Sequence, residues 1–258
     1  MKQNSLGTAD YGLIGHPLEH SFSKVMFNRL FASDGSGCQY ENFNLPTLDA
    51  AALYSLVLLN PRLKGFNVTS PYKEKIMEFL DRTDTLAQAV GAVNTVKIER
   101  RDDGFVTALK GYNTDVFGFT EAIGPLLADT DRKALILGTG GASKAAVTAL
   151  AMLGIEALKV SRTGRDGAMT YADLTPQVME EYSVIVNCTP AGMYPAVEAM
   201  PPVPMQHIDS RHLCFDMIYN PEETLFLREA RSRGARTANG SEMLMFQAMK
   251  ALDIWQNE

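Results

Sequence analysis

The chain of 258 residues has few of the features that mark secreted, metal-binding or membrane proteins. No apolar run approaches the roughly 18 residues that cross a bilayer. His16 and His20 have the spacing of two ligands on one helix face, but Pro17 lies between them, so no metal site is expected. The cysteines are odd in number and lack C-x-x-C spacing, which favours reduced, buried thiols. They are Cys38, Cys188 and Cys214.

Basic charge is also sparse. The formal net charge is −6, and the Lys and Arg residues are scattered, so nucleic acid is not expected as a partner. Glycine, histidine and proline interrupt the apolar residues near the N-terminus, which excludes a signal peptide and predicts a cytoplasmic protein. The 46% hydrophobic and 21% charged content is typical of a globular protein that buries a core.

The stretch GFNVTSPYKEK, residues 65–75, allows two incompatible interpretations. Asn67-Val68-Thr69 matches the acceptor pattern for N-glycosylation, which occurs twice more in the chain. Without an export signal this pattern loses its meaning, and glycosylation is rejected. The alternative is a strand that ends in a turn, with Ser70-Pro71 as N-cap and first-turn proline of a helix carrying Lys73 near its third position.

The second half of the chain predicts a parallel sheet of βαβ type. Residues 134–137 are an apolar run typical of a buried parallel strand, and residues 138–141 turn the chain into a helix over 143–153. Gly154 ends this helix at the C′ position, and residues 158–160 return as the next strand. Two further apolar strands are expected, over 183–190 and 213–219.

The first half alternates strands and helices as well. An early helix is predicted to have the period set by Phe22, Val25, Met26 and Leu30, with Asn28 and Arg29 facing solvent. The other expected elements are strands at 11–15, 38–45 and 65–69, a helix over 48–59, and a hairpin around Asp103-Gly104. No Pro/Gly/Ser linker separates the halves, which predicts two α/β domains in tight contact.

A glycine-rich turn follows the first strand of the second half. Residues 138–143, GTGGAS, fit G-x-G-x-x-[small] between a strand and a helix, where the backbone can approach a pyrophosphate at the positive end of the helix dipole. Glycine turns are common, but the complete strand-turn-helix-strand context favours dinucleotide binding over a plain turn.

The end of the next strand indicates which dinucleotide is bound. NAD enzymes place an acidic residue there, which would repel a 2′-phosphate. This chain has Ser161, Arg162 and Thr163, with Arg165 nearby, and a guanidinium with two hydroxyls favours NADP. An exposed loop arginine without a ligand is the alternative.

Four polar residues near predicted helix starts have both a structural and a functional interpretation. Ser21 and Ser23 are ordinary N-cap candidates, or hydroxyls that seat a substrate carboxylate. Lys73 is a solvated helix residue, and Asp115 a first-turn acid that complements the helix dipole. As a pair facing a nicotinamide, Asp115 would hold the Lys73 ammonium, and the lysine would exchange a proton with a reacting hydroxyl.

Several segments together resemble the shikimate dehydrogenase family across nearly the whole chain. They are YGLIGHPLEHSFS, GFNVTSPYK, GAVNT, GYNTDVFGF, GTGGAS, SRT, DMIYNP and NGSEMLMFQA. Each is moderately specific, and their order and spacing are highly specific. The resemblance implies an N-terminal α/β substrate domain, residues 1–114 with 240–258, and a Rossmann-type NADP-binding domain, residues 115–239. It also implies that the last helix, residues 241–255, returns to the first domain, with the active site in the cleft between domains.

The resemblance also implies the role of each site residue. The catalytic pair would be Lys73 and Asp115. The substrate carboxylate would be held by Ser21, Ser23 and Tyr219, and the ring hydroxyls by Thr69, Asn94, Asp115 and Gln247. The cofactor would be bound by Gly138, Gly140, Gly141 and Ala142 at the pyrophosphate, by Ser161, Arg162 and Thr163 at the 2′-phosphate, and by Met217 and Gly240 beside the nicotinamide.

The sequence departs from the family pattern in four places. Lys24 replaces a common proline, and Ser161 replaces a common asparagine. Arg165 comes one position early, and Asp166 takes the usual place of the second arginine. The first eight or so residues precede the usual start of the family.

The expected activity is the reversible reduction of 3-dehydroshikimate to shikimate with NADPH, a step of chorismate and aromatic amino acid biosynthesis. Two alternatives remain open at this point. One is a quinate/shikimate dehydrogenase that uses NAD, which Ser161 and Asp166 favour. The other is a sensor that binds dinucleotide or shikimate without catalysis. The expected partners are small molecules, with no nucleic acid or membrane, and the chain is expected to be a monomer or homodimer.

Overall fold

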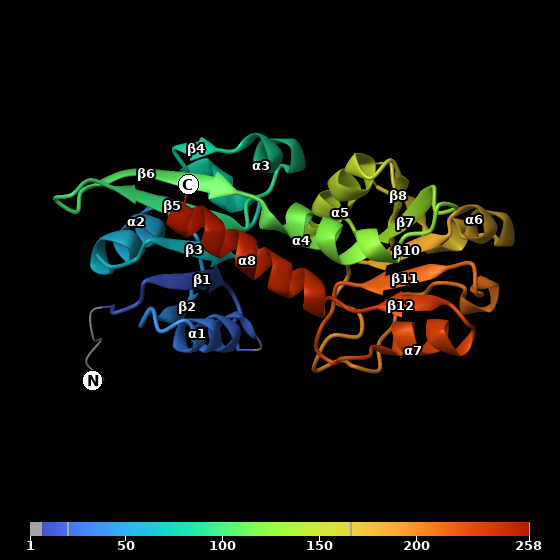
Figure 1. Ribbon diagram of the computed structural model, residues 1–258. Coiled ribbons are helices and arrows are strands. Elements are labelled where there is room, and N and C mark those ends of the chain that lie inside the picture. The colour runs from blue at the N-terminus through green and yellow to red at the C-terminus, as the bar shows by residue number, and fades with distance from the viewer. Residues whose placement is uncertain (1–6, 20, 166, 258) are drawn as a thin grey trace. The chain divides into compact units, whose positions relative to one another are not determined.

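The computed structural model describes residues 7–19, 21–165 and 167–257. Contacts divide the chain into two units, Met1–Thr114 with Ala248–Glu258, and Asp115–Gln247. Each unit contains one six-stranded sheet with helices packed on it (Figure 1). The α/β class with two sheets is therefore confirmed. Helix α8, Ser241–Asn257, contributes residues to both units.

The first unit has a mixed sheet in the order β2-β1-β3-β5-β6-β4. Strands β1, β2 and β3 are parallel to one another, whereas β5 is antiparallel to both β3 and β6. The strands are β1 Tyr11–Gly15, β2 Tyr40–Asn44, β3 Gly65–Val68, β4 Arg82–Thr83, β5 Thr95–Arg100 and β6 Val106–Tyr112. The helices are α1 Ser23–Ser33, α2 Ala50–Leu59, α3 Thr85–Val90 and the short 3-10 helix η1 Lys75–Phe79.

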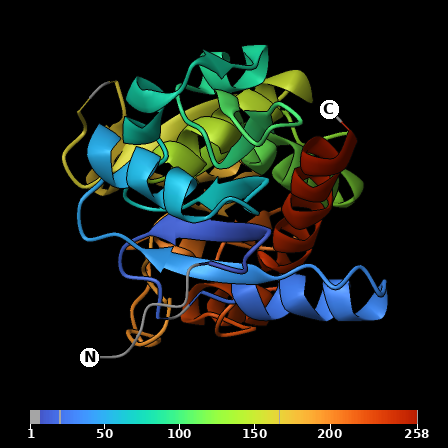
Figure 2. The ribbon, with the colours of Figure 1, turned by 90° about the vertical axis from the view of Figure 1, so that its left-hand side faces the viewer.

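The two faces of this sheet bury different clusters. On one face, Leu53 and Val57 of α2 pack with residues of β1, β3 and β5. On the other face, Phe27 and Phe31 of α1 pack with Tyr11 of β1 and the last turns of α8. Figure 2 shows β1 and β2 lying between α2 on one side and α1 on the other. The alternating side chains of β1 thus cover both faces of the sheet.

The second unit has an entirely parallel sheet in the order β12-β11-β10-β7-β8-β9. Two series of strands run outward from the neighbours β7 and β10, which is the Rossmann order with its switch point between those two strands. The strands are β7 Lys133–Leu137, β8 Glu156–Ser161, β9 Met169–Thr170, β10 Val184–Asn187, β11 Leu213–Asp216 and β12 Arg236–Ala238. The Rossmann prediction is confirmed.

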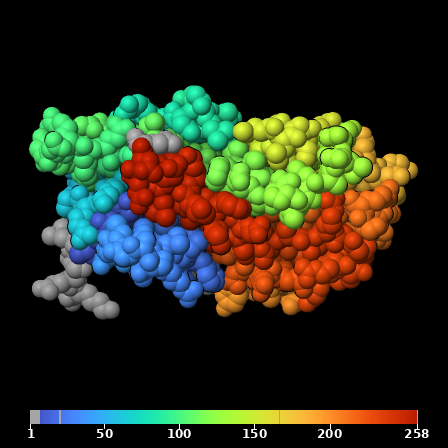
Figure 3. Space-filling view, viewed as in Figure 1, coloured from blue at the N-terminus to red at the C-terminus, as the bar shows by residue number. Residues whose placement is uncertain are grey.

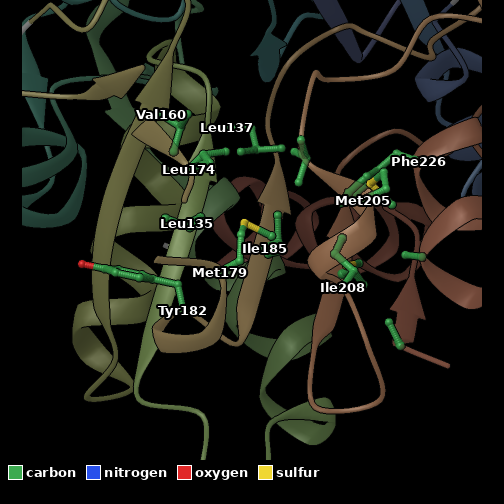
Figure 4. Close-up of a cluster of buried hydrophobic side chains, with 14 of the residues drawn as sticks. Leu135, Leu137, Val160, Leu174, Met179, Tyr182, Ile185, Met205, Ile208 and Phe226 are labelled. Carbon is green, nitrogen blue, oxygen red and sulfur yellow. The ribbon is translucent and has the colours of Figure 1, made fainter. Parts of the chain in front are cut away.

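Helices cover both faces of the parallel sheet. The helices are α4 Thr114–Ile123, α5 Gly141–Met152, α6 Pro176–Glu181 and α7 Leu225–Ser232, with 3-10 turns η2 Gly124–Leu126, η3 Tyr171–Asp173 and η4 Met205–His207. On one face, side chains of β7, β8 and β10 meet Met179 of α6 and Phe226 of α7 (Figure 4). Phe119 of α4 packs edge-on against Phe215 of β11, whose side chain points to the opposite face from that of Cys214 in the first cluster.

Helix α8 is only partly covered by its surroundings. Figure 3 shows the side chains of α8 at the surface, next to those of α1 in the first unit. Trp255 and Ile254 at the end of this helix are nevertheless buried, at 4% and 2% exposure. The helix therefore turns one face to solvent and packs the other on the first sheet.

The helix predicted from Ser70-Pro71 is wrong. Residues 70–74 form a turn, and the short 3-10 helix begins only at Lys75, so Lys73 lies before the helix. Tertiary bonds explain the difference. The buried Tyr72 donates its hydroxyl to the Leu45 carbonyl at 2.7 Å, and the Val93 N–H donates to the Lys73 carbonyl at 2.7 Å. These contacts hold the backbone in a turn, whose geometry the Ser-Pro pattern by itself does not determine.

The predicted buried face of α1 is also wrong. Phe22 and Val25 are 44% and 48% exposed, and the buried residues are Phe27 and Phe31. The ring of Phe27 stacks on Tyr40 at 4.4 Å between centroids, and Phe31 lies 5.5 Å from Tyr11. These ring contacts fix which face of the helix is buried, and Phe22 lies before the helix as its N-cap residue, so it does not share the helical period.

The other predicted elements of the core are present. The hairpin forms between β5 and β6, with Gly104 at positive φ in its turn. Helix α5 is followed by Gly154 at a φ of 75°, as expected of a C′ glycine. The three cysteines are all free, but of the expected buried thiols only Cys214 is fully buried, whereas Cys38 and Cys188 are half-buried. Burial raises the pKa of Cys214 to about 12. The sequence analysis does not predict strands β4, β9 and β12 or helices α3, α6 and α7.

Candidate active site

The predicted substrate residues of the first unit gather at one edge of its sheet. Strands β1, β3 and β6 point the same way and β5 runs against them, so the ends of the first three and the start of β5 share an edge. Ser21 and Ser23 follow β1, Thr69 and Lys73 follow β3, and Asn94 precedes β5. The topology therefore brings together five residues that are distant in sequence.

Backbone hydrogen bonds of Lys73 and of the residues before it fix the position of Lys73. Its carbonyl accepts the Val93 N–H, which joins the lysine turn to the segment that carries Asn94. The Thr69 N–H donates to the Ile14 carbonyl, and the Thr69 carbonyl accepts the Tyr72 N–H at 3.0 Å. The Lys73 side chain is partly exposed. These backbone hydrogen bonds fix the lysine at this edge of the sheet.

Asn94 is buried, with 3% of its surface exposed, and joins three elements. Its side-chain oxygen accepts the Thr114 N–H at 2.7 Å and the Thr114 hydroxyl at 3.1 Å, at the start of α4. Its backbone carbonyl accepts the Val68 N–H at the end of β3. These bonds use the oxygens of Asn94, so its side-chain nitrogen is the donor suited to a ligand hydroxyl.

The structure also shows whether Asn67 could carry a sugar. Its side-chain nitrogen donates to the Asn94 carbonyl at 3.2 Å and to the Thr95 hydroxyl at 3.0 Å. Its side-chain oxygen accepts the Tyr40 hydroxyl at 2.8 Å. The amide thus cross-links β2, β3 and β5 inside the sheet, which is incompatible with an exposed sugar attachment site. Val68 is buried beside it, whereas Thr69 is partly exposed.

Ser21 and Ser23 are not side-chain caps of α1. Phe22 is the N-cap residue, and no side chain bonds there. The Ser21 hydroxyl accepts the Ser23 N–H at 3.3 Å in a local turn. Both serines are partly exposed at the start of the helix. The capping interpretation is therefore wrong, and the hydroxyls lie where a helix N-terminus attracts anions.

In the second unit, the glycine turn lies at the end of β7, beside the switch point. Gly138 has a φ of 113°, and an added Cβ would come within 3.2 Å of the Ser143 hydroxyl. Gly140 is the N-cap of α5, which has no side-chain cap, and a Cβ there would meet nothing within 4 Å. The free N–H groups and the open space suit a pyrophosphate. Gly141 and Ala142 begin the helix.

The end of β8 carries the predicted 2′-phosphate residues. The Ser161 hydroxyl accepts the Gly164 N–H at 3.0 Å and so shapes the loop. The loop carries three exposed residues, Arg162, Thr163 and Arg165. Asp166 lies outside the described residues. The loop offers two guanidinium groups and a hydroxyl, which fit a phosphate dianion.

A buried polar network that the sequence analysis missed lies at the carboxyl ends of β10 and β11. The Asp216 carboxyl, at the end of β11, accepts the Asn187 amide at 3.0 Å, the Thr224 hydroxyl at 2.7 Å and the Ile218 N–H at 3.0 Å. Asn187, at the end of β10, in turn accepts the Thr189 hydroxyl at 2.7 Å. Burial raises the pKa of Asp216 to about 6. The signal in the sequence was a polar residue at the end of each apolar strand.

This network brings Met217 and Gly240 together. The Met217 N–H donates to the Asn187 carbonyl, and the Gly240 N–H donates to the Ile218 carbonyl. A Cβ on Gly240 would lie 2.1 Å from the Met217 carbonyl oxygen, so only glycine fits. Tyr219 follows in the same loop and is partly buried.

Gln247 and Asp115 complete the predicted set. A Cβ on Gly118 of α4 would lie 2.6 Å from the Gln247 Cγ, so α4 and α8 pack closely in the second unit. Asp115 is buried in the first turn of α4, directly after Thr114. Lys73 belongs to the first unit and Asp115 to the second, so their pairing stays a prediction.

Two kinds of feature are absent from the part of the chain that the structure describes. No helix there is both long and apolar enough to cross a bilayer. No group of three or more His, Cys, Asp or Glu side chains there is arranged to hold a metal ion.

Comparison with known proteins identifies the family of the chain. Residues 13–96 match the model of the shikimate dehydrogenase substrate binding domain. A shikimate dehydrogenase (NADP(+)) of Caldanaerobacter subterraneus subsp. tengcongensis is 38% identical over 97% of this chain and 92% of the relative. Among solved structures, a shikimate dehydrogenase in complex with NADP+ has a TM-score of 0.82 at 34% identity, covering 97% of this chain and 91% of that chain.

A third relative was solved with both ligands. Shikimate 5-dehydrogenase from Thermus thermophilus, in complex with NADP(H) and shikimate, has a TM-score of 0.82 at 31% identity, covering 97% of this chain and 94% of that chain. The similarity thus extends over both units at an identity that marks common descent. The chain belongs to the shikimate dehydrogenase family.

Proposed function

We propose that this protein is an NADP-dependent shikimate dehydrogenase that reversibly reduces 3-dehydroshikimate to shikimate. One observation carries the proposal. The carboxyl edge of the first sheet gathers Lys73, Thr69 and Asn94, while the second unit has a Rossmann sheet whose glycine turn and basic loop suit NADP. Membership of the family supports the same activity, because the relatives named above are shikimate dehydrogenases.

The second unit would hold the cofactor at three places. Gly138, Gly140, Gly141 and Ala142 would face the pyrophosphate, Ser161, Arg162 and Thr163 the 2′-phosphate, and Met217 and Gly240 the nicotinamide. Bound NADP(H) accepts or supplies the hydride of the reaction. The residues fit, since the turn leaves open space at Gly140 and the loop exposes Arg162.

Lys73 and Asp115 would carry the proton chemistry. When shikimate is oxidised, the hydrogen on the reacting ring carbon is transferred as hydride to NADP+, and the hydroxyl proton passes to Lys73 in its neutral amine form. When 3-dehydroshikimate is reduced, Lys73 returns that proton to the new alkoxide oxygen. Asp115 would hold the ammonium in place. Each step balances with one hydride and one proton.

The remaining predicted residues would orient the substrate. Ser21 and Ser23 at the start of α1, with Tyr219, would bind the carboxylate. Thr69, Asn94, Asp115 and Gln247 would bind the ring hydroxyls. The domains would divide accordingly, with residues 1–114 and 240–258 for substrate and 115–239 for NADP.

We further propose a cytoplasmic enzyme, monomeric or homodimeric, whose partners are small molecules and neither nucleic acid nor membranes. The net charge of −6 supports this, because it disfavours association with polyanions.

The test is the substitution Lys73→Ala with Lys75→Ala as matched control, since Lys75 is an exposed lysine two residues away. Lys73→Ala is expected to lower kcat at least about a hundredfold, the usual size of a lost acid/base group, while the Kd for NADP is unchanged. Lys75→Ala should retain activity. Undiminished turnover in Lys73→Ala would remove the lysine from the mechanism.

One assay separates the proposal from its alternatives. Initial rates with shikimate and with quinate, each with NADP and with NAD, are followed by absorbance of the reduced nicotinamide. Turnover confined to shikimate and NADP supports the proposal. Comparable rates with quinate and NAD would support the dual-substrate enzyme that Ser161 and Asp166 suggested. Binding of shikimate without turnover under any condition would support a sensor.

A further inference from the structure

A buried carboxyl group lies at the carboxyl edge of the parallel sheet without a cation beside it. Asp216 ends β11, and none of its surface is exposed. Among the described residues, its carboxyl accepts hydrogen bonds only from the Asn187 amide, the Ile218 N–H and the Thr224 hydroxyl, which are all uncharged. The proposed mechanism gives this carboxyl no role.

The negative charge of Asp216 is not needed for these hydrogen bonds. One carboxyl oxygen accepts from Asn187 and Ile218, and the other accepts from Thr224. An asparagine could accept the first two bonds through its oxygen and donate to the Thr224 hydroxyl oxygen through its nitrogen. Burial raises the pKa of Asp216 to about 6, so the ionised form predominates at neutral pH although it is desolvated. A neutral amide would avoid this electrostatic cost.

The segment that Asp216 holds is the one proposed to meet the nicotinamide. Met217 follows Asp216 directly and donates its N–H to the Asn187 carbonyl, and the Gly240 N–H donates to the Ile218 carbonyl. A Cβ on Gly240 would lie 2.1 Å from the Met217 carbonyl oxygen, so these two backbones are in close contact. Adjacent Cα atoms are about 3.8 Å apart, which places a ring against Met217 on the order of 10 Å from the Asp216 carboxylate.

The oxidised and reduced forms of the cofactor differ in charge at this place. The nicotinamide ring carries one positive charge in NADP+ and none in NADPH, whereas the phosphate groups are the same in both forms. A buried carboxylate attracts a cation across a medium of low dielectric constant and has no such attraction for a neutral ring. The oxidised ring would therefore supply the positive charge that is missing around Asp216.

We propose, building on the proposed function, that Asp216 is a positioning residue whose ionised carboxylate favours NADP+ over NADPH. It would act through space and through the backbone of Met217, without touching the cofactor. Stabilising the oxidised form makes bound NADPH a stronger hydride donor, because the product of hydride loss is then bound more tightly than the reactant. The carboxylate would thus favour reduction of the substrate on the enzyme.

Other ionisable groups lie on the elements that adjoin Asp216. They are Cys188 after β10, Cys214 on β11, Tyr219, Glu222 and Glu223 after β11, and Asp115 at the start of α4. Desolvation raises the pKa of the Cys214 thiol to about 12 and raises that of Cys188, with a contribution from both aspartates, so neither thiol ionises near pH 6. Glu223 is paired with Arg231. A substitution at Asp216 leaves all of these groups in place, so the difference from wild type reports on Asp216.

A simpler explanation is that Asp216 only shapes the loop after β11. A loop of changed shape would alter the affinity for both cofactor forms, because both use the same loop. The ratio of the two Kd values would then stay constant. This ratio also cancels the titration of the 2′-phosphate near about pH 6, which the two forms share. The ratio therefore separates a role of the charge from a purely structural role.

The test is calorimetric titration of the full chain with NADP+ and with NADPH at about pH 8, well above the pKa of Asp216. In Asp216→Asn, we expect the Kd for NADP+ to rise about tenfold and that for NADPH to change less than about twofold. This is the size expected for two unit charges about 10 Å apart at an effective dielectric constant of about 20. The control Glu156→Gln removes the same charge from the amino end of β8 and should leave both Kd values unchanged. Equal changes of the two Kd values in Asp216→Asn would overturn the proposal.

A second measurement needs no substitution. As pH falls from about 8 to about 5, protonation of Asp216 should raise the Kd for NADP+ severalfold relative to that for NADPH in the wild type. The ratio should be independent of pH in Asp216→Asn. A constant ratio in the wild type would overturn the proposal, even if the variant did not fold. Absence of binding of both forms would overturn the proposed function as well, whereas binding of both with an invariant ratio would overturn this inference alone.

Discussion

The two edges of the parallel sheet each bury an aspartate, but in opposite electrostatic settings. Asp131, before β7, accepts the Arg236 guanidinium at 2.9 Å and the Ser183 hydroxyl at 2.7 Å. Asp216, at the end of β11, accepts bonds only from neutral donors among the described residues. Burial acts to raise the pKa of both. At Asp131 the bonds from Ala128, Ser183 and Arg236 outweigh it and lower the pKa, whereas at Asp216 burial prevails and the pKa is about 6.

The difference between the two aspartates shows how the two edges of the sheet are stabilised. At the amino edge, a compensated ion pair joins β12 to the residues before β7. At the carboxyl edge, where open α/β sheets bind their ligands, the buried carboxyl bonds the end of β10 and both ends of the connection from β11 to α7, with no cation among its described partners. The carboxyl edge thus retains an electrostatic cost that the amino edge avoids, as is common at sites shaped for a ligand.

The largest expected effect comes from breaking the ion pair between Asp131 and Arg236 at the amino edge. Arg236→Met leaves the Asp131 carboxylate buried without its cation and should lower the free energy of unfolding by about 3 kcal/mol. Arg233→Met, which breaks the more exposed pair with Glu229, should cost less than about 1 kcal/mol. Urea denaturation measures both. Equal losses in the two variants would contradict the special role of the buried pair.

The second prediction contrasts the pH dependence of the two aspartates. The pKa of Asp216 is raised in the folded state, so its contribution to stability is fully present below the unfolded pKa near 3.8. This contribution is lost as pH rises through about 6, which lowers the free energy of unfolding by about 2–3 kcal/mol. Asp216→Asn should abolish this decline. Asp131 has the opposite sign, since its lowered pKa stabilises the fold above pH 3.8 and this is lost as pH falls.

Denaturation curves between about pH 3 and pH 8 check this prediction for the wild type and for the variants Asp216→Asn and Asp131→Asn. The difference between wild type and each variant should slope in opposite directions. Parallel slopes would show that the two carboxyls titrate alike, and the comparison would fail.

A smaller effect is expected at the glycine turn. Gly138→Ala forces an alanine into a φ of 113° and should cost about 1–2 kcal/mol of stability. Gly140→Ala, at a φ of −78° with open space, should change stability by less than about 0.5 kcal/mol. It should nevertheless weaken NADP binding at least about tenfold, because the new methyl occupies the pyrophosphate approach. Calorimetric titration measures the Kd for NADP, and an unchanged Kd in Gly140→Ala would contradict the assignment.

The smallest effect on stability is expected at the exposed Arg162. Arg162→Gln should leave the free energy of unfolding unchanged while weakening NADP binding about tenfold and NAD binding hardly at all. The ratio of the two Kd values is the measurement, with Arg165→Gln as the neighbouring comparison. A larger effect of Arg165 would move the 2′-phosphate contact to that residue.

Local patterns were sufficient for most elements near the site. The apolar run before Gly138 and the Gly154 stop predicted the β7–α5 unit, and Asp103-Gly104 predicted the hairpin. The patterns failed where tertiary contacts determine the outcome. Tyr72 holds the Lys73 segment in a turn, and stacking of Phe27 on Tyr40 rotates α1 away from its apparent apolar face.

The amino-acid sequence by itself determined the two α/β units, the glycine turn, the basic loop and the resemblance to a family, because each depends on residues close together in the chain. Only the tertiary structure showed that Asn67 is a cross-link inside the sheet and that Asp216 and Asn187 are joined at the carboxyl edge. Those features depend on strand order and burial, which bring distant residues together and remove them from water. Local sequence patterns indicate neither strand order nor burial.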